Sequence, residues 1–239
     1  MKDFKMLDIL ACTKGYNQVF TDFLNYCLYI LSVGFFKEDF IQLQKAYTSE
    51  ELLCFENMFC MLGNESENFN DALGDIFMDY ISYGNNGQFF TPNPITDFMA
   101  QILGVGEVGV HETICDPSCG SGRMLLSAAK SCVKTNGGLR PFCYGADIDL
   151  TCVKMTTINM LLNSIPGEIA WMNSITMEHW KSYKIDLLLI NGMWFPSFKI
   201  LEAGQTSFTT KLKNTFEDKP ELKEQTKKKI EAKQLALEF

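Results

Sequence analysis

The sequence predicts an α/β protein in which an N-terminal helical region precedes a partial, doubly wound parallel sheet. Apolar residues recur at helical spacing through residues 1–80, and from about residue 112 short apolar runs alternate with longer helical patterns. Strands and helices that alternate at this spacing form βαβ units, whose strands lie parallel in one sheet. The length of 239 residues allows one domain with an appendage.

The first 80 residues contain no proline and few runs of β-branched residues, so we expect helices there. Asn70 or Asp71 is suited to cap the last helix of this block. A turn at Gly84-Asn85-Asn86-Gly87 ends the block, and Pro94 can occupy the first turn of the helix that follows.

Short apolar runs predict four strands, at residues 113–115, 142–146, 168–171 and 185–190, with helices over 121–134 and 150–163. Residues 187–190 are apolar without alternation, which is typical of a parallel strand with both faces buried. The fourth strand is expected at an edge of the sheet, where the C-terminal tail or another chain would have to cover it, unless the chain is part of a longer or split gene product.

The predicted organisation has three parts. Residues 1–83 form the helical region, residues 84–198 form the α/β domain, and residues 199–239 form a polar loop and a charged helix. In that last part acids come early and lysines late, which suits the helix dipole.

Composition excludes several classes of protein. The apolar fraction of 46% and the charged fraction of 21% are ordinary for a globular protein. No apolar stretch approaches the roughly 18 residues of a membrane-spanning helix, and the N-terminus is too interrupted by charge for a secretory signal. Nine scattered cysteines indicate free thiols in a reducing cytoplasm, and two histidines without a CxxC pair indicate no metal site.

The net charge of −8 bears on nucleic-acid binding. Arg123 and Arg140 are the only arginines in the sequence, whereas a chain that holds duplex DNA unaided normally carries a basic face. A role on DNA would therefore depend on a partner or on a small local patch.

The segment Asp116-Pro-Ser-Cys-Gly-Ser-Gly122 lies between a predicted strand and a predicted helix, where doubly wound sheets bind their ligands. Gly120 and Gly122 let the backbone bend sharply and approach a ligand, and the helix offers free N–H groups to an anion. The segment lacks the GK[ST] of a Walker loop and the full GxGxxG pattern. Arg123, which follows the turn, could contact a carboxylate, but is expected on the helix surface.

The second strand ends at Gly145-Ala-Asp147, and an acid in this place can accept hydrogen bonds from both ribose hydroxyls of an adenosine. Asp147 or Asp149 could instead cap the next helix. The glycine turn and this acid in order favour an adenosyl ligand.

These residues belong to motifs that resemble the N6-adenine DNA methyltransferase family, in the branch of modification (M) subunits of type I restriction-modification systems. The likeness runs from about Asp71 to Trp194. The matching segments are Asp71-Ala-Leu-Gly-Asp-Ile-Phe (the helix before the first motif), Gly87-Gln-Phe-Phe-Thr-Pro92 (GQFYTP), Asp116–Gly122 (DPACGSG), Gly145-Ala-Asp147 with Asn159-Met160 (GxE…NM), and Asn173-Ser174 (GNS).

The resemblance implies a partial S-adenosylmethionine-dependent methyltransferase (Rossmann-like) sheet with a pocket for that cofactor. In the family the GQFYTP motif contacts the methionine end of the cofactor, the acid after the second strand holds the ribose, and the polar residue of GNS lies near the adenine ring. The implied cofactor-binding residues are Gln88, Phe89, Phe90, Thr91, Pro92, Asp116, Ser118, Gly120, Ser121, Gly122, Asp147 and Asn173.

After the fourth strand the family carries [N/D]PP[F/Y/W], where this chain has Asn191-Gly-Met-Trp194. The family's Asn or Asp and the next carbonyl accept the hydrogens of the adenine amine, and the aromatic ring stacks on the flipped base. The resemblance therefore makes Asn191 and Trp194 the catalytic candidates. Both prolines are missing, and a misplacement of about 1 Å can cost roughly a hundredfold in rate. Alternatively, Asn191-Gly192 is only a turn and Trp194 a packing residue.

Three functions follow as hypotheses. The first is a DNA adenine-N6 methyltransferase of a restriction-modification or mobile-element system, which uses S-adenosylmethionine and reaches double-stranded DNA with a specificity or other protein subunit. The second is a catalytically degenerate subunit that acts in assembly or regulation. The third is a protein methyltransferase, against which the GQFFTP segment argues. We also expect a homo-oligomer that covers the sheet edge, no membrane association and a cytoplasmic location.

Overall fold

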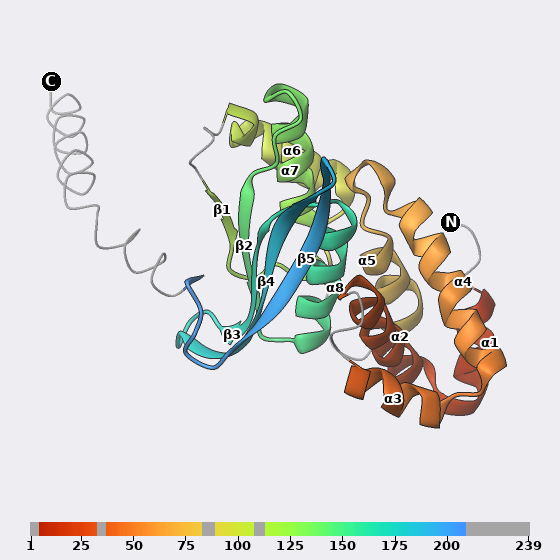
Figure 1. The fold of residues 1–239 in the computed structure, drawn as a ribbon. Helices are drawn as coiled ribbons and strands as arrows, with labels where there is room; N and C mark the ends of the chain where they lie inside the picture. The colour runs from red at the N-terminus through yellow and green to blue at the C-terminus, as the bar shows by residue number, and fades with distance from the viewer. Residues whose placement is uncertain (1–4, 33–36, 83–88, 108–112, 209–239) are drawn as a thin grey trace, which may run out of the picture.

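A computed structural model describes residues 5–32, 37–82, 89–107 and 113–208, and Figure 1 shows how their elements are arranged. The helical elements are α1 (Lys5–Lys14), α2 (Tyr16–Leu31), α3 (Lys37–Ala46), α4 (Ser49–Glu65), η1 (Glu67–Phe69), α5 (Ala72–Ile76), η2 (Phe77–Ile81), α6 (Asn93–Ile102), η3 (Val105–Glu107), α7 (Arg123–Thr135) and α8 (Leu150–Leu162). The strands are β1 (Thr113–Asp116), β2 (Phe142–Asp147), β3 (Gly167–Asn173), β4 (Glu178–Ile190) and β5 (Met193–Glu202).

The helical N-terminal region is confirmed for the described residues, and its helices begin where side chains can cap them. Helix α4 starts at a capping box, in which Thr48 and Glu51 accept hydrogen bonds from each other's backbone N–H. The side chain of Asp71 caps α5, and Pro94 lies in the first turn of α6, both as predicted. The turn predicted at residues 84–87 lies outside the described residues. In the described part of the chain, none of the helices is long and apolar enough to span a bilayer.

The sheet has the strand order β1-β2-β3-β4-β5. The first three strands are parallel, as predicted, with Ile114 opposite Cys143 and Gly145 opposite Ile169. Helices α7 and α8 form the two crossovers. Because parallel strands point the same way, the carboxyl ends of β1, β2 and β3 share one edge of the sheet.

The prediction of a fourth parallel strand was wrong, because β4 runs antiparallel to β3, with Ile185 opposite Gly167. Strand β5 pairs with β4 from Lys181 to Ile190, although none of the residues of β5 carried a strand prediction. The fourth strand is therefore not at the edge of the sheet, where β1 and β5 lie instead. The prediction that both faces of this strand are buried was also wrong, since Leu188, Leu189 and Ile190 are 47%, 59% and 49% exposed.

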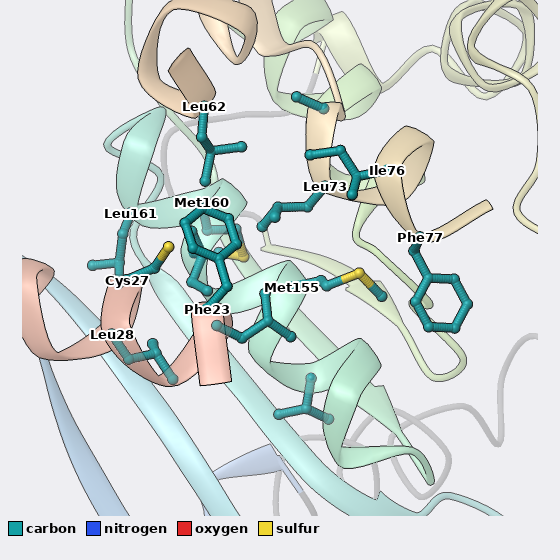
Figure 2. Packing of buried hydrophobic residues seen from close by; sticks show 14 of the residues in the cluster. Phe23, Cys27, Leu28, Leu62, Leu73, Ile76, Phe77, Met155, Met160 and Leu161 are labelled. Atoms are coloured by element: carbon teal, nitrogen blue, oxygen red, sulfur yellow. The ribbon is translucent and has the colours of Figure 1, made fainter. Parts of the chain in front are cut away.

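The hydrophobic core lies between the sheet and the helices, and α2 and α8 meet near its centre. Figure 2 shows Phe23 and Cys27 of α2 beside Met160 and Leu161 of α8, with Leu73 of α5 close by. The same cluster of buried side chains extends from Leu7 in α1 to Phe198 in β5. The core is thus continuous across the boundary predicted at residues 83 and 84.

The other face of the sheet contacts the segment that follows β5. Phe208 is buried there against Tyr144, with ring centroids 5.9 Å apart. The fully buried carboxylate of Glu168 in β3 accepts hydrogen bonds from the hydroxyl of Thr206 and from the hydroxyl and backbone N–H of Ser207. These bonds fix the chain over β3 after it leaves β5.

Candidate functional site

The carboxyl ends of the parallel strands bring together side chains that lie far apart in the sequence. The glycine turn after β1 is tied to the end of β2, because the backbone N–H of Gly120 donates to Oδ2 of Asp147 at 2.9 Å. It is also tied to the end of β3, because the hydroxyl of Ser174 donates to the carbonyl of Pro117. The turn and the predicted ribose acceptor therefore form one local structure.

Two glycines of this turn adopt backbone conformations that side chains would strain. Gly120 has a φ of +55° and Gly122, the N-cap of α7, has a φ of +89°. A Cβ at Gly120 would lie 2.9 Å from Cδ1 of Phe90, and one at Gly122 would lie 2.9 Å from Cγ2 of Thr156. Both the φ angles and the close neighbours require glycine here.

The two acids after β2 have separate tasks. Asp149 is the N-cap of α8, because its carboxylate accepts from the N–H of Thr151 at 2.8 Å. Asp147 instead accepts from Gly120 with one oxygen and from the N–H of Asp149, at 2.9 Å, with the other. Burial raises the pKa of Asp147, which the N–H groups of Asp149 and Gly120 partly oppose. Burial also raises the pKa of Asp116, and the charge of Asp147 adds to that shift.

The segment from Phe89 to Pro92 lies against the glycine turn. The ring of Phe90 packs on Phe77, with centroids 5.4 Å apart, and occupies the space that a side chain at Gly120 would need. The carbonyl of Thr91 accepts a hydrogen bond from Arg123, and Pro92 is the N-cap of α6. Phe89 is 83% exposed. Gln88 lies outside the described residues.

A buried carboxylate of the N-terminal region, that of Asp71, forms hydrogen bonds with the glycine turn and its neighbours. Asp71, which is fully buried, accepts from the backbone N–H of Gly74 at 2.8 Å and from three side chains. The donors are the hydroxyl of Ser121 at 2.5 Å, Nε of Arg123 at 2.8 Å and the amide of Asn159 at 2.7 Å. We call Asp71, Ser121, Arg123 and Asn159 the Asp71 cluster.

The expectation that Arg123 lies on a helix surface was wrong, since this residue is only 8% exposed. Its guanidinium also contacts Asp75, with Nη2 and Oδ1 2.7 Å apart. A buried guanidinium needs carboxylate partners, and both of them come from α5 and its cap. Sequence reasoning missed the Asp71 cluster because Asp71 is 50, 52 and 88 residues away from Ser121, Arg123 and Asn159, and no local pattern can connect residues so far apart.

A cavity of about 360 Å³ lies beside β1, between α6 and α7. Three predicted site residues, Thr91, Asp116 and Ser118, line this cavity. The other lining side chains are mostly apolar. The cavity therefore extends from the glycine turn along β1.

Asn173 ends β3, and its side chain forms the turn that follows. Its Oδ1 accepts hydrogen bonds from the N–H groups of Ile175 and Thr176, at 3.0 and 3.1 Å. The predicted contact of Asn173 with an adenine ring remains a prediction.

The structure does not bring the two catalytic candidates to this edge of the sheet. Asn191 and Gly192 form the tight turn between β4 and β5, with φ angles of +51° and +81°, and Trp194 beside them is 62% exposed. Strand β4 has 13 residues, so at about 3.3 Å per residue its ends lie roughly 40 Å apart. Its start pairs with Asn173 near the glycine turn, so the Asn191 turn is at the opposite end (Figure 1).

A local signal for this hairpin was present in the sequence. Asn-Gly is the preferred pair for two-residue hairpin turns, because both residues must adopt positive φ. The alternative in which Asn191-Gly192 is a turn matches the observed conformation.

Comparison with known proteins identifies the family of the chain. Residues 67–233 match the family model described as N-6 DNA Methylase. The chain is 30% identical over 151 residues to the type I restriction enzyme MpnII methylase subunit of Mycoplasma pneumoniae, covering 58% of this chain and 27% of that protein. It is 31% identical over 134 residues to the EcoEI methylase subunit of Escherichia coli, covering 52% of this chain and 26% of that protein.

Among solved structures, one described as a class I S-adenosylmethionine-dependent methyltransferase from Listeria monocytogenes aligns with a TM-score of 0.45 and 18% identity, over 70% of this chain and 50% of that chain. The chain spans about a quarter of the length of the curated relatives that it matches. The family model covers well over half of the chain, including the glycine turn, Asp147 and the Asp71 cluster. The chain therefore belongs to the N-6 DNA methylase family.

Proposed function

We propose that this chain binds S-adenosylmethionine at the glycine turn and supplies the cofactor-binding part of a DNA adenine-N6 methyltransferase. The observation that carries the proposal is the hydrogen bond between Gly120 and Asp147, which couples the turn to the acid at the end of β2. Adenosyl cofactors are bound by this pair of features in doubly wound sheets.

The residues present suit such a cofactor in hydrogen bonding and in charge. A carboxylate has about four acceptor positions, and Asp147 keeps capacity for hydroxyl donors beyond its bonds to Gly120 and Asp149. S-adenosylmethionine carries a net positive charge at neutral pH, and Asp116 adds a second carboxylate near Asp147. When bound, the cofactor supplies the methyl group for transfer.

Other residues of the site would position the cofactor and exclude water. Phe90 covers Gly120, and Thr91 and Ser118 line the adjoining cavity with Asp116. Residues 89–92 are held against the turn by the bond from Arg123 to the carbonyl of Thr91. This arrangement supports a role for the segment at the methionine end of the cofactor.

Methyl transfer to adenine needs hydrogen-bond acceptors for the amine within reach of the methyl donor. We propose that Asn191 accepts hydrogen bonds from the adenine amine and that Trp194 stacks on the base. Both roles require an arrangement in which the β4–β5 hairpin of this chain, or the β4–β5 hairpin of a partner copy, lies at the cofactor site. The distance along β4 favours a second candidate function for the isolated chain, namely a cofactor-binding subunit that acts in assembly or regulation.

We propose that double-stranded DNA is reached through a specificity or other protein subunit. Two arginines in a chain of net charge −8 favour this over unaided DNA binding. The hairpin tip is a candidate subunit contact, in a homo-oligomer or with another protein, because it exposes contiguous apolar side chains: Leu188, Leu189, Ile190, Met193, Trp194 and Phe195. Nine free cysteines suit a reducing, cytoplasmic location.

Calorimetric titration of the full chain with S-adenosylmethionine tests the proposal. We expect saturable binding that weakens at least tenfold in Asp147→Asn. The matched control is Asp149→Asn, which changes the same charge two residues away and keeps a side chain that caps α8. Absence of binding to the folded chain, or equal loss in both variants, would reject the proposed site.

A methyl-transfer assay on adenine-containing duplex DNA separates the two candidate functions. Transfer by the chain alone that is lost in Asn191→Ala would support the enzyme. Cofactor binding without transfer, with or without a partner subunit, would support the second function.

A further inference from the structure

We propose that the β4–β5 hairpin of one copy of this chain docks on the face formed by α6 and β1 of a second copy. The docking deepens the proposed function, and its consequence for the cofactor site rests on that function. Three features of the chain carry it: an apolar stripe on α6, an outer strand without a buried residue, and a hairpin tip that extends beyond the strand next to it.

Helix α6 and the residue that caps its C-terminus present an apolar stripe to the surface. The side chains of this stripe are 41% to 68% exposed and recur at the spacing i, i+3, i+4, i+7 and i+8, which is one face of a helix. Thr96 and Ala100, on another side of α6, are buried. We call the following residues the α6 stripe: Ile95, Phe98, Met99, Ile102 and Leu103. A contiguous exposed apolar surface of this kind marks a site of protein contact.

The α6 stripe borders strand β1. Met99 and Leu103 line the cavity of about 360 Å³ together with Ile114 and Cys115 of β1. Within the described residues, β1 pairs with β2 alone, and none of its four residues is buried, whereas residues 143–146 of β2 all are. Parallel strands are normally covered on both faces. The α6 stripe and the cavity therefore suit a further strand that pairs with β1.

The hairpin tip offers a strand of the matching kind. Strand β4 pairs with β3 only as far as Ile185, so among the described strands residues 186–190 pair with β5 alone. Residues 187–190 are apolar without alternation, a pattern typical of a strand that is buried on both faces. The single chain does not provide this burial, since Leu189 is 59% exposed. Docking between β1 and the α6 stripe provides it.

The occupant is a second copy, because a chain cannot bring its tip to its own β1. Strands β2 and β3 lie between β1 and β4 in the sheet. Residues 187–195 and the α6 stripe carry no charge, so the contact avoids the repulsion between two copies of net charge −8. When each copy donates its tip to the other, the two contacts are equivalent and the assembly closes as a dimer.

Parallel pairing with β1 brings the catalytic candidates to the cofactor site. Residues 187–190 match the four residues of β1, so that Ile190 lies beside Asp116. Asn191 then follows at the carboxyl end of β1, where the glycine turn begins. The site of one copy is thus completed by Asn191 and Trp194 of the other.

Sedimentation equilibrium of the full chain, without S-adenosylmethionine, tests the docking. We expect a concentration-dependent dimer, and dimerisation at least tenfold weaker in Leu189→Glu, at the tip, and in Ile102→Lys, in the α6 stripe. Ile9→Lys is the matched control, because Ile9 of α1 is 64% exposed and Ile102 is 68% exposed. A chain that stays monomeric overturns the proposal, and so does equal weakening by all three variants.

A mixture of two variants separates this contact from a contact between like surfaces. A mixed dimer of Leu189→Glu with Ile102→Lys has one unaltered tip on an unaltered stripe and one new pair of opposite charges. The mixture should therefore dimerise at least tenfold more tightly than either variant alone. If tips met tips, or stripes met stripes, one of the two variants would dimerise like the unaltered chain, and the proposal would fail.

Disulfide formation tests the register of the pairing. Parallel pairing puts Leu189 beside Cys115, which is an exposed free thiol. Under mild oxidation Leu189→Cys should give a covalent dimer, and the additional change Cys115→Ser should abolish it. Leu188→Cys is the matched control, because adjacent residues of a strand face opposite sides of the sheet. No covalent dimer in Leu189→Cys, or an equal yield in Leu188→Cys, overturns the parallel pairing.

These outcomes are distinguishable from those of the proposed function. A chain that binds S-adenosylmethionine but does not dimerise through these surfaces overturns the docking alone. A chain that dimerises through them but does not bind S-adenosylmethionine overturns the proposed function and leaves the contact in place.

Discussion

The hydroxyl of Ser121, in the glycine turn, donates to the buried carboxylate of Asp71 at 2.5 Å, across 50 residues of sequence. Asp71 itself caps helix α5 of the N-terminal region. The conformation of the turn is therefore supported from outside the sheet, by a residue whose own position depends on helix packing.

Removal of this carboxylate should be strongly destabilising. Asp71→Ala would leave the guanidinium of Arg123 buried without its inner partner, and loss of one member of a buried pair costs about 3–5 kcal/mol. Urea unfolding monitored by circular dichroism measures the change. In the control Asp97→Ala, which breaks the exposed contact with Lys130, the loss should stay below about 1 kcal/mol. Similar losses in both variants would argue against a special role for Asp71.

A pair of glycine substitutions should have opposite effects. A Cβ at Gly74, in α5, would overlap the carboxylate of Asp71, so Gly74→Ala should cost about 1–3 kcal/mol by overpacking. A Cβ at Gly63, in α4, meets nothing within 4 Å, so Gly63→Ala should stabilise by about 0.5–1 kcal/mol. Thermal unfolding of the two variants checks this. A stable Gly74→Ala would mean that Asp71 can move freely.

As the pH falls, cofactor binding should begin to weaken at a higher pH than it would if the site contained aspartates of ordinary pKa. Burial raises the pKa of Asp116 and of Asp147, so both carboxylates lose charge early as the pH falls. The contribution of these groups to stability has the opposite sign: with a raised folded pKa it is present at low pH and is lost as the pH rises through that pKa.

Titrations with S-adenosylmethionine at several pH values between about 7 and 4, alongside unfolding curves, separate the two effects. The pH dependence of binding should be flatter in Asp147→Asn, because one titrating group is missing. Binding that weakens only in step with unfolding would contradict the assignment.

The apolar hairpin tip should promote association. Leu189 is 59% and Trp194 is 62% exposed, so Leu189→Lys and Trp194→Lys should reduce self-association or subunit binding while changing stability by less than about 0.5 kcal/mol. Sedimentation over a range of concentrations, alone and with a partner subunit, measures this. Ile175→Lys is the control, since Ile175 is 94% exposed elsewhere on the chain. An unchanged association in the tip variants would exclude this surface.

Local patterns sufficed to predict β1, β2, β3 and the helices between them. Each of these strands is a short apolar run next to a helix with clear periodicity, and the glycine turn marks where β1 ends. The glycine turn and Asp147 were expected around one ligand from the rule that ligand-binding groups gather at carboxyl ends of parallel strands, whereas the hydrogen bond between Gly120 and Asp147 was not predicted.

The direction of β4 could not be predicted in the same way. The apolar run over residues 187–190 indicates a strand but carries no information on its neighbours, and pairing with β5 gives it an antiparallel partner. The buried position of Arg123 depends on Asp71, which only the three-dimensional packing brings close. The prolines that would follow Asn191 are replaced by Gly192 and Met193, and the resulting Asn191-Gly192 pair was itself the hairpin signal.

The Asp71 cluster also bears on how such a chain can be divided or recombined. A cut at residue 84 would put the carboxylate on one fragment and Ser121, Arg123 and Asn159 on the other. A gene exchange at that point would succeed only when the incoming helical segment carries an acid in the place of Asp71. The helical region and the sheet are thus expected to be inherited together, as a single module.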